Sequence, residues 1–391
     1  MYLKTMGPAE FGVSPTTGFM PETDPLRRLP RSYDLWEDAA HLLPKLLVGD
    51  SIREIVCDLP PFPLDALKSG PEVERAMVLL SYLGHAYVWS GTEAADRIPA
   101  VLAVPWHAVA KRLGRPPVLS YASYCLHNWL RIQPDRPVEV GNVALIQNFL
   151  AGEDEEWFVL IHADIEMRAA QGVSRLLELQ QAVADRDEER VRCILEILAN
   201  SIEGMNRTMD RMPEHCDPYI YFHRVRPYIH GWRDHPGLLG GVLYEGVSEY
   251  GSRPQTFRGE TGAQSGIVPA LDAVLRIRHG ADELRSYLME MREYMPPRHR
   301  AFVEHLEAGP DLRSFVVDGG AVVRNWYNAC VAGVDEFRST HLKFAASYIH
   351  QQASKDPKNP SDVGTGGTPF MPYLRKHRDE TRASAAGYSA P

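Results

Sequence analysis

The sequence predicts an all-α protein, and three observations carry that prediction. Apolar residues recur at intervals of three and four along most of the 391-residue chain, which is the period of an amphipathic helix. Strict alternation of apolar and polar residues, the mark of a half-buried strand, is rare. Hydrophobic residues make up 44% of the chain, enough for a sizeable core.

The length suits two domains, and the composition indicates where they divide. Residues 1–32 are rich in proline and glycine, lack periodicity and predict an irregular N-terminal arm. We expect a small helical domain over 33–150, with helices at 34–47 and 72–89. The Pro-Pro pair at 116–117 should end a helix, and a short helix should follow it.

A large helical domain is expected over 151–391. Residues 154–184 read as one long helix, whose acidic start suits the positive end of a helix dipole. Further helices are expected at 191–209, 271–279, 281–295 and 321–351, with a loop at 251–266. The polar Gly/Pro segment 352–368 predicts a long loop, and we expect it to act as a lid.

The overall composition excludes several classes of protein. A net charge of −9 argues against a general nucleic-acid binder and against electrostatic membrane attachment. Five scattered cysteines, with no CxxC or CxxCH spacing, fit reduced thiols in a cytoplasm. No signal peptide is visible, and no apolar run approaches the ~18 residues that span a bilayer. We therefore expect a cytoplasmic protein without nucleic-acid or membrane partners.

Two histidines fall on apolar helix faces. His341 lies in a stripe with spacings of three and four, formed by Trp326, Cys330, Val334, Phe337, Ala345 and Tyr348. Such a histidine is more often a hydrogen-bonded core residue, but a dry imidazole is also a common iron or haem ligand. His162 occupies a similar face of the helix expected at 154–184. Two long helices that each bury one histidine would be able to sandwich a planar cofactor.

Two other segments carry candidate binding groups. Residues 217–232 crowd aromatic side chains around Arg226, which would suit an aromatic ligand that bears a carboxylate. An aromatic core helix with an exposed arginine explains that pattern equally well. The GTGGT run at 364–368 has no preceding strand and no following lysine, so it is not a phosphate-binding P-loop. Other catalytic signatures, namely HExxH, GxSxG and GxGxxG, are absent.

The order of several short motifs resembles the indoleamine 2,3-dioxygenase family. The motifs are SYASYCLHNW (120–129), GW (231–232), GVLYEGV (241–247), GAQSGIV (262–268) followed by Asp272, REYMPPRHRAF (292–302), WYNACV (326–331), RSTHLKFAASYI (338–349) and GTGGT. The similarity extends over roughly residues 33–380. The resemblance implies a small N-terminal helical domain over a larger helical domain that holds haem b.

The resemblance also implies roles for individual residues. His341 matches the proximal iron ligand, Arg338 the arginine at the haem propionates, and Asp272 the carboxylate that supports that side. Arg226 matches the clamp on the substrate carboxylate, and Thr365 a loop threonine near the substrate ammonium. The remaining matches are Tyr121, Phe158 and Phe222 in the substrate pocket, and Thr261 and Gly262 in the loop over the haem edge.

The chain departs from the family pattern in the expected pocket. His162 stands where the mammalian enzymes have serine, and in this it is similar to the tryptophan 2,3-dioxygenases, whose histidine contacts the indole N–H. Tyr221 stands where the family usually has phenylalanine, and Tyr124 and Cys125 also differ. We therefore expect His162 and Tyr221 to act on the substrate, with His162 and Arg226 as the catalytic pair.

The activity that the resemblance implies is haem-dependent dioxygenation. Both atoms of O2 would enter the indole C2=C3 bond of L-tryptophan or a related indole amino acid and give an N-formylkynurenine-type product, as in the kynurenine pathway of tryptophan catabolism. An electron donor would keep the iron ferrous. Three alternatives stay open at this point: a haem enzyme of secondary metabolism that acts on a substituted tryptophan, a haem-binding sensor without turnover, and a helical scaffold without a cofactor.

Overall fold

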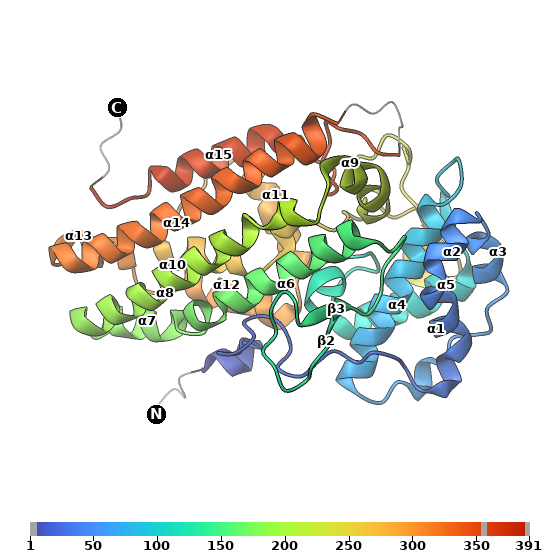
Figure 1. Cartoon of the computed structure of the whole chain (residues 1–391), viewed down its shortest axis with the longest axis horizontal. Helices are drawn as coiled ribbons and strands as arrows, with labels where there is room; N and C mark the ends of the chain where they lie inside the picture. The colour runs from blue at the N-terminus through green and yellow to red at the C-terminus, as the bar shows by residue number, and fades with distance from the viewer. Residues whose placement is uncertain (1–5, 353–357, 388–391) are drawn as a thin grey trace.

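A computed structural model describes residues 6–352 and 358–387 and confirms the all-α prediction (Figure 1). The helices are α1 (Asp34–His41), α2 (Leu43–Val48), α3 (Ile52–Cys57), α4 (Gly70–Trp89), α5 (Ala100–Leu113), α6 (Glu153–Val173), α7 (Leu176–Ala184), α8 (Glu188–Met209), α9 (Pro218–Ile220), α10 (Ile267–Leu275), α11 (Glu283–Met291), α12 (Pro297–Glu307), α13 (Leu312–Asp318), α14 (Ala321–Ala345) and α15 (Phe370–Arg382). In the described chain the strands are short: β1 (Arg97–Ile98) pairs in parallel with β4 (Leu243–Tyr244), and β2 (Trp129–Arg131) pairs antiparallel with β3 (Val143–Leu145).

The helices gather in two groups. Figure 1 shows α1–α5 together at one end of the molecule, while α6, α8, α14 and α15 extend along the rest of it. Helix α8 packs between α6 and α14, and α15 lies against α14. The buried apolar side chains of both groups belong to one connected cluster, so the boundary at residue 150 stays a prediction.

The packing of α6 on α8 follows from their sequences. The predicted stripe on α8 is buried, from Val191 to Met209. On α6, a Cβ atom at Gly172 would lie 2.8 Å from the Leu198 side chain. Glycine therefore permits the close approach of the two helices, although it lowers helix propensity by about 1 kcal/mol.

Two predicted helices are each divided in the structure. The segment 154–184 forms α6 and α7, because the chain tightens into a turn at Ser174 and Arg175, where Arg175 N–H donates to Gly172 O. The segment 34–47 forms α1 and α2, which begins with Leu43 and Pro44. Proline has no N–H and its ring crowds the preceding turn, so one continuous helix is disfavoured there. Helix α15 was not predicted at all.

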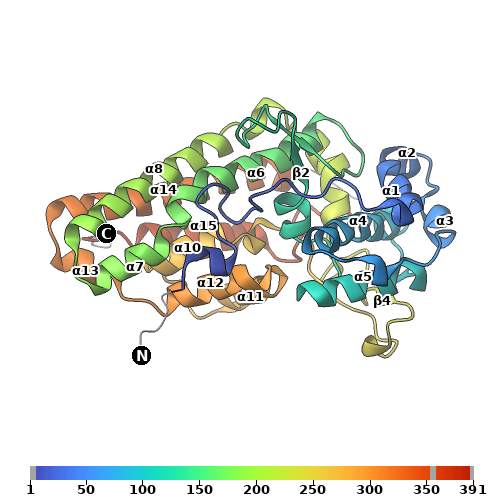
Figure 2. The ribbon, with the colours of Figure 1, turned by 90° about the horizontal axis from the view of Figure 1, so that it is seen from below.

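The N-terminal arm lies along the large helical group before it reaches α1 (Figure 2). Its described part contains two short 3-10 turns, at Pro8–Phe11 and, where the arm ends, at Arg31–Tyr33. The rings of Phe11 and Phe19 pack on Phe302 of α12, with centroids 5.6 and 5.8 Å apart. These contacts attach the arm to the body of the protein. Residues 1–5 of the predicted arm lie outside the described residues.

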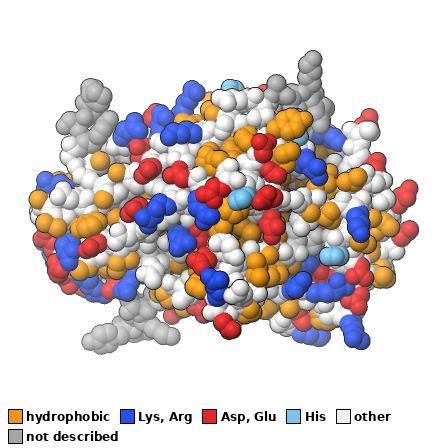
Figure 3. Space-filling model, viewed as in Figure 1, with side chains coloured by type: hydrophobic (Ala, Val, Ile, Leu, Met, Phe, Trp, Pro, Cys, Tyr) orange, Lys and Arg blue, Asp and Glu red, His pale blue; other side chains and the backbone are white. Residues whose placement is uncertain are grey.

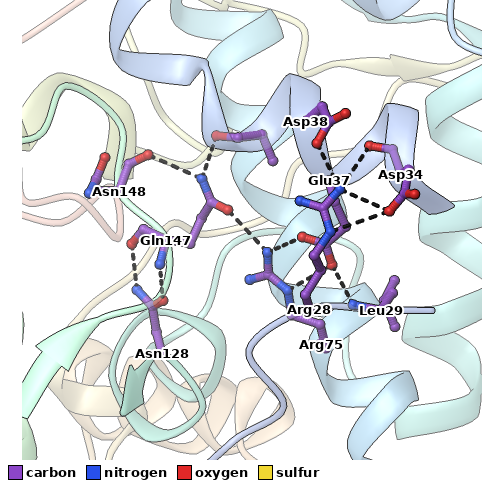
Figure 4. Close-up of polar contacts among 10 residues, drawn as sticks. Arg28, Leu29, Asp34, Glu37, Asp38, Arg75, Asn128, Gln147 and Asn148 are labelled. Carbon is purple, nitrogen blue, oxygen red and sulfur yellow. Dashed lines mark hydrogen bonds and ion pairs between the residues drawn. The ribbon is translucent and has the colours of Figure 1, made fainter. Parts of the chain in front are cut away.

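A buried ion pair connects α1 to α4 (Figure 4). Arg75 Nε donates to Glu37 Oε1 over 3.0 Å, and both side chains are at most 3% exposed. Glu37 also accepts the Leu29 N–H at 2.8 Å, and Arg75 reaches Gln147 at 3.3 Å. Removal of one partner from such a pair costs about 3–5 kcal/mol, so this network fixes the end of the arm and the first helices on the core.

On the face in Figure 3, acidic and basic side chains are interspersed. Among the described residues, none of the helices combines the length and apolarity needed to cross a membrane. All five cysteines are free thiols.

Candidate active site

A cavity of about 740 Å³ opens inside the larger helical group. That volume lies within the roughly 300–1,000 Å³ typical of ligand sites. Its wall comes from α6, α8, α10, α11, α14 and α15 and from the loops around residues 260–265 and 364–368. Much of the lining is apolar, including Ile165, Met205, Val268, Leu284, Phe337 and Phe344.

The structure brings most of the predicted site residues to this one cavity. Those that line it are Tyr121, Phe158, His162, Tyr221, Thr261, Gly262, Asp272, Arg338, His341 and Thr365. They come from positions more than 240 residues apart in the sequence and from both long histidine-bearing helices. Phe222 and Arg226 are not among the lining residues, and both are fully buried.

His341 projects from α14 into the cavity rather than into the core. Its side chain is exposed to the cavity, and no hydrogen bond to it is found in the described part of the chain. Burial within the protein, followed by the nearby His162 and Arg338, lowers the pKa of His341 to about 4. The ring is therefore neutral and has a nitrogen lone pair. In a hydrogen-bonded core histidine a protein donor would occupy that lone pair, whereas none is found here among the described residues.

His162 faces the same cavity from α6. Its Nδ1 lies 2.7 Å from the Phe158 carbonyl oxygen one turn earlier, a distance at which Nδ1–H donates. Burial lowers the pKa of His162 below its ordinary value, so the ring is neutral. With the proton on Nδ1, Nε2 carries a lone pair, and no partner for Nε2 is found among the described residues. The backbone thus fixes His162 as a hydrogen-bond acceptor.

Aromatic side chains form one wall beside His162. The ring of Phe158 lies 4.7 Å from those of both His162 and Tyr221, and Tyr221 lies 5.8 Å from Tyr348. Tyr221 begins a turn of π-helix, η6 (Tyr221–Val225), and Tyr348 lies in another, η11 (Ala346–His350). A third π-helical turn, η4 (Ala122–Leu126), follows Tyr121. Such turns often occur at functional sites, and here they lie beside lining tyrosines.

A charged network supports the opposite side. Arg338 on α14 donates to Asp272 Oδ2 at 2.6 Å and also to the Thr381 hydroxyl of α15. His279 Nε2 lies 3.0 Å from the same Asp272 oxygen and His279 Nδ1 lies 2.6 Å from Glu380 of α15. Burial alone would raise the pKa of Asp272, but Arg338 and His279 outweigh it and lower the pKa to about 2. Asp272 is thus an anion that joins α10, α14 and α15.

Arg226 contacts the C-terminal loop instead of the cavity. Its guanidinium donates to Asn359 Oδ1 at 2.5 Å and to the carbonyl oxygens of Pro360 and Val363 at 2.8 and 2.5 Å. Burial lowers the pKa of Arg226 to about 10, and the group keeps its charge at neutral pH. Arg226 was expected to face a bound ligand, but in the structure its guanidinium is buried against the C-terminal loop. Arg226 thus holds part of the segment 352–368, for which a lid was predicted, and residues 353–357 of that segment lie outside the described residues.

Two carboxyl groups at the cavity were not predicted as site residues. Glu260 lines it between Gly259 and Thr261, and it read only as part of a polar loop. Glu166 lies directly behind the wall, where its Oε1 accepts hydrogen bonds from the hydroxyls of Tyr121 and Ser265, both at 3.0 Å. Its spacing of one helical turn from His162 was a visible signal, whereas the burial of Glu260 had none in the sequence.

The residues present fit haem. His341, a neutral imidazole without a partner among the described residues, faces a large, mostly apolar cavity, and the cation Arg338 lines the same cavity. Asp272 Oδ1 is buried without a hydrogen-bond partner among the described residues, so a polar group of the wall is left unsatisfied. Across the described residues, no group of three or more His, Cys, Asp or Glu side chains converges as it would around a bare metal ion. A single imidazole ligand suits an iron that a macrocycle already holds.

Comparisons with known proteins identify the family of the chain. A sequence profile of the family described as indoleamine 2,3-dioxygenase matches residues 7–384. The chain is 34% identical to indoleamine 2,3-dioxygenase 2 of Homo sapiens, over 96% of this chain and 94% of that protein. It is also 34% identical to indoleamine 2,3-dioxygenase acdA of Aspergillus candidus, over 96% of both chains. The chain is 30% identical to the indoleamine 2,3-dioxygenase of Saccharomyces cerevisiae, over 96% of this chain and 93% of that protein.

Proposed function

The chain belongs to the indoleamine 2,3-dioxygenase family of haem-dependent enzymes, and on that premise we propose that it oxidises L-tryptophan or a closely related indole amino acid. Both atoms of O2 would enter the indole C2=C3 bond, and the product would be of the N-formylkynurenine type. The observation that carries the proposal is the pair of neutral histidines, His341 and His162, which face one apolar cavity from α14 and α6.

We propose haem b as the cofactor, and His341 is the residue that would bind its iron. When bound, ferrous haem supplies the oxygen chemistry. Arg338 would neutralise the propionates, because it lies at the cavity wall and Asp272 holds its guanidinium in place. Thr261 and Gly262 would border the macrocycle from the neighbouring loop.

His162 would orient the substrate through its free nitrogen. Since Nδ1–H donates to Phe158 O, Nε2 is available to accept the indole N–H. The rings of Phe158 and Tyr221 would then stack against the indole at the aromatic wall. Together these contacts would hold the indole in one orientation, which is a large part of the catalytic effect of a bound site.

The C-terminal loop would cover the site and keep it dry. Thr365 Oγ1 donates to Glu260 O at 2.6 Å, and Arg258 donates to Gly366 O at 2.6 Å. For Arg226 to hold a substrate carboxylate, it would exchange its contacts to Asn359 and the loop carbonyls for that ligand. We propose this exchange as the step that couples substrate binding to the position of the loop.

A substituted tryptophan is the second candidate substrate. The Tyr221 side chain lines the cavity, and no hydrogen-bond partner for its hydroxyl is found in the described chain. A hydroxyl at that point would favour an indole with an added polar substituent. We further propose an electron donor that keeps the iron ferrous, and a cytoplasmic location, which suits five free cysteines.

The test is oxygen uptake and product mass with the haem-loaded, reduced protein and L-tryptophan. We expect a Soret band, and a product heavier than tryptophan by two oxygen atoms. His341→Ala should lose the Soret band, whereas Cys330→Ala, on the same helix but away from the cavity lining, should keep it. Haem binding without any oxidation of tryptophan would move the search to substituted tryptophans. Unchanged haem binding in His341→Ala would refute the assignment of the ligand.

A further inference from the structure

Glu260 is a buried carboxyl group that faces the cavity without a partner. The residue is 4% exposed, it lines the cavity, and no hydrogen bond or ion pair to its carboxyl group is found among the described residues. The other two carboxylates of the lining are paired: Asp272 with Arg338, and Glu307 with Arg292. Buried polar groups are nearly always satisfied, so an unpaired one that faces a cavity indicates a ligand.

The backbone around Glu260 is held rigidly. Its N–H donates to Ile229 O at 3.1 Å, and its carbonyl accepts from Thr365 Oγ1 at 2.6 Å. Two loop segments cross here and are in contact at Gly231 and Gly259, where a Cβ atom on Gly231 would lie 2.1 Å from Gly259 N. Only glycine permits this approach. The fold therefore fixes the backbone from which the Glu260 side chain reaches the cavity.

Glu260 lies near the aromatic wall at which the indole is expected. When it is ionised, it raises the pKa of neighbouring groups: after burial, it is the largest cause that raises the pKa of Cys125, and it contributes in the same direction at Tyr121 and Tyr221. Burial alone raises the pKa of Glu260 itself to about 8, because no cation lies near enough to oppose it. A ligand that brings a positive charge to this point would relieve that cost.

We propose that Glu260 binds the α-ammonium group of the substrate and thereby restricts the enzyme to indoles with a free side-chain amine. An ammonium group offers three donors and a full positive charge, which a desolvated carboxylate binds through strong, charge-assisted hydrogen bonds. Thr365, which holds the Glu260 carbonyl, would then connect the closed loop to an occupied site. This inference rests on the proposed function, since it specifies the part of an indole amino acid that is recognised.

The experiment compares two ligands that differ only in the amine. The haem-loaded protein is titrated calorimetrically with L-tryptophan and with indole-3-propionate, which lacks the ammonium group. We expect Glu260→Gln to weaken L-tryptophan binding by about tenfold or more and to leave indole-3-propionate within about twofold. Glu260→Asp should recover part of the loss. The matched control is Glu307→Gln, a second lining carboxylate that is already paired, and it should leave the preference unchanged. A constant Soret band verifies that each variant holds haem.

The outcomes separate this inference from the proposed function. Equal affinity of the wild type for both ligands, or an equal loss for both in Glu260→Gln, would overturn the inference even if tryptophan is oxidised normally. A preference for the amine that depends on Glu260, without any oxygenated product, would support the inference and refute the proposed reaction on tryptophan.

Discussion

Substitution of Glu166 by glutamine should change how the stability of the protein depends on pH. Glu166 lies on α6, is fully buried, and accepts hydrogen bonds from Tyr121 and Ser265 through one oxygen, while its other oxygen has no partner among the described residues. Burial raises its pKa from the ordinary 4.5 to about 7, against the two hydrogen bonds, which lower it. Glutamine keeps an acceptor for both hydroxyls but cannot ionise.

The magnitude follows from that pKa. A group whose pKa is raised in the folded protein contributes stability that is complete below its unfolded pKa and is lost as the pH rises through the folded value. Each pKa unit corresponds to about 1.4 kcal/mol, so ionisation of Glu166 in the unfolded chain removes about 3 kcal/mol in total, and most of this loss falls between pH 5 and pH 8. The variant should lack this loss. Relative to wild type, it should gain about 2–3 kcal/mol between those two pH values.

Urea unfolding of the two proteins at pH 5, 6, 7 and 8 measures the gap, which is the difference between their free energies of unfolding. Other titrating groups are common to both proteins and cancel in the difference. The control Glu203→Gln removes a carboxyl group that is exposed on the neighbouring helix α8 and forms only a surface ion pair with Arg207, so the difference in free energy of unfolding from the wild type should stay below about 1 kcal/mol at each pH. A gap for Glu166→Gln that does not change from pH 5 to pH 8 would mean that Glu166 is ionised in the folded protein, and the reasoning from burial would be wrong.

Three further predictions concern the cavity. His162→Ser should retain haem and its Soret band, because His341 is the proposed iron ligand. It should lower kcat or change the preferred indole, since the hydrogen-bond acceptor on α6 is lost. An unchanged kcat and KM for every indole tested would remove His162 from the site. Arg226→Ala should raise the KM for L-tryptophan far more than it weakens haem binding, and it should also make the segment around Asn359 more sensitive to limited proteolysis, because three hydrogen bonds to the loop disappear; equal activity would exclude the clamp. Asp272→Asn should destabilise the protein by about 3 kcal/mol or more at pH 7, because Arg338 is left buried without its anion, and transfer of haem to apomyoglobin should become faster. Since the pKa of Asp272 is lowered to about 2, its contribution is lost as the pH falls below 4, and the gap between the two proteins should narrow there.

Much of the fold was predictable because helical periodicity is a local property. The stripe on α8 and the long α14 were identified from spacing alone. The α8 stripe is buried as expected, whereas the α14 stripe buries Cys330 and Val334 but exposes His341 to the cavity. The errors concern helix ends, where a turn or a proline interrupts a segment whose helical periodicity continues. The turn at Ser174 divides a run that stays amphipathic on both sides, and Pro44 begins a new helix inside an apolar segment. Helix α15 was missed because it is short of apolar residues and is stabilised by its contacts with α14 and with Asp272 through His279.

The site was predictable mainly through motif order. Periodicity placed His341 on an apolar face but left a hydrogen-bonded core residue as the commoner alternative, and the structure shows that its ring faces a cavity instead. Arg226 was correctly found among aromatic residues, yet its guanidinium contacts the loop at 359–363, a relation between segments more than 130 residues apart.

The sequence by itself determined the helical class of this protein, the family to which it belongs, and the two histidine-bearing helices, because these depend on patterns within short stretches or on the order of motifs. Only the tertiary structure decided which polar groups lack partners. Glu260 and Glu166 are ordinary glutamates in the sequence, and desolvation by distant segments raises the pKa of both carboxyl groups. Desolvation depends on everything packed around a group, so no local pattern encodes it.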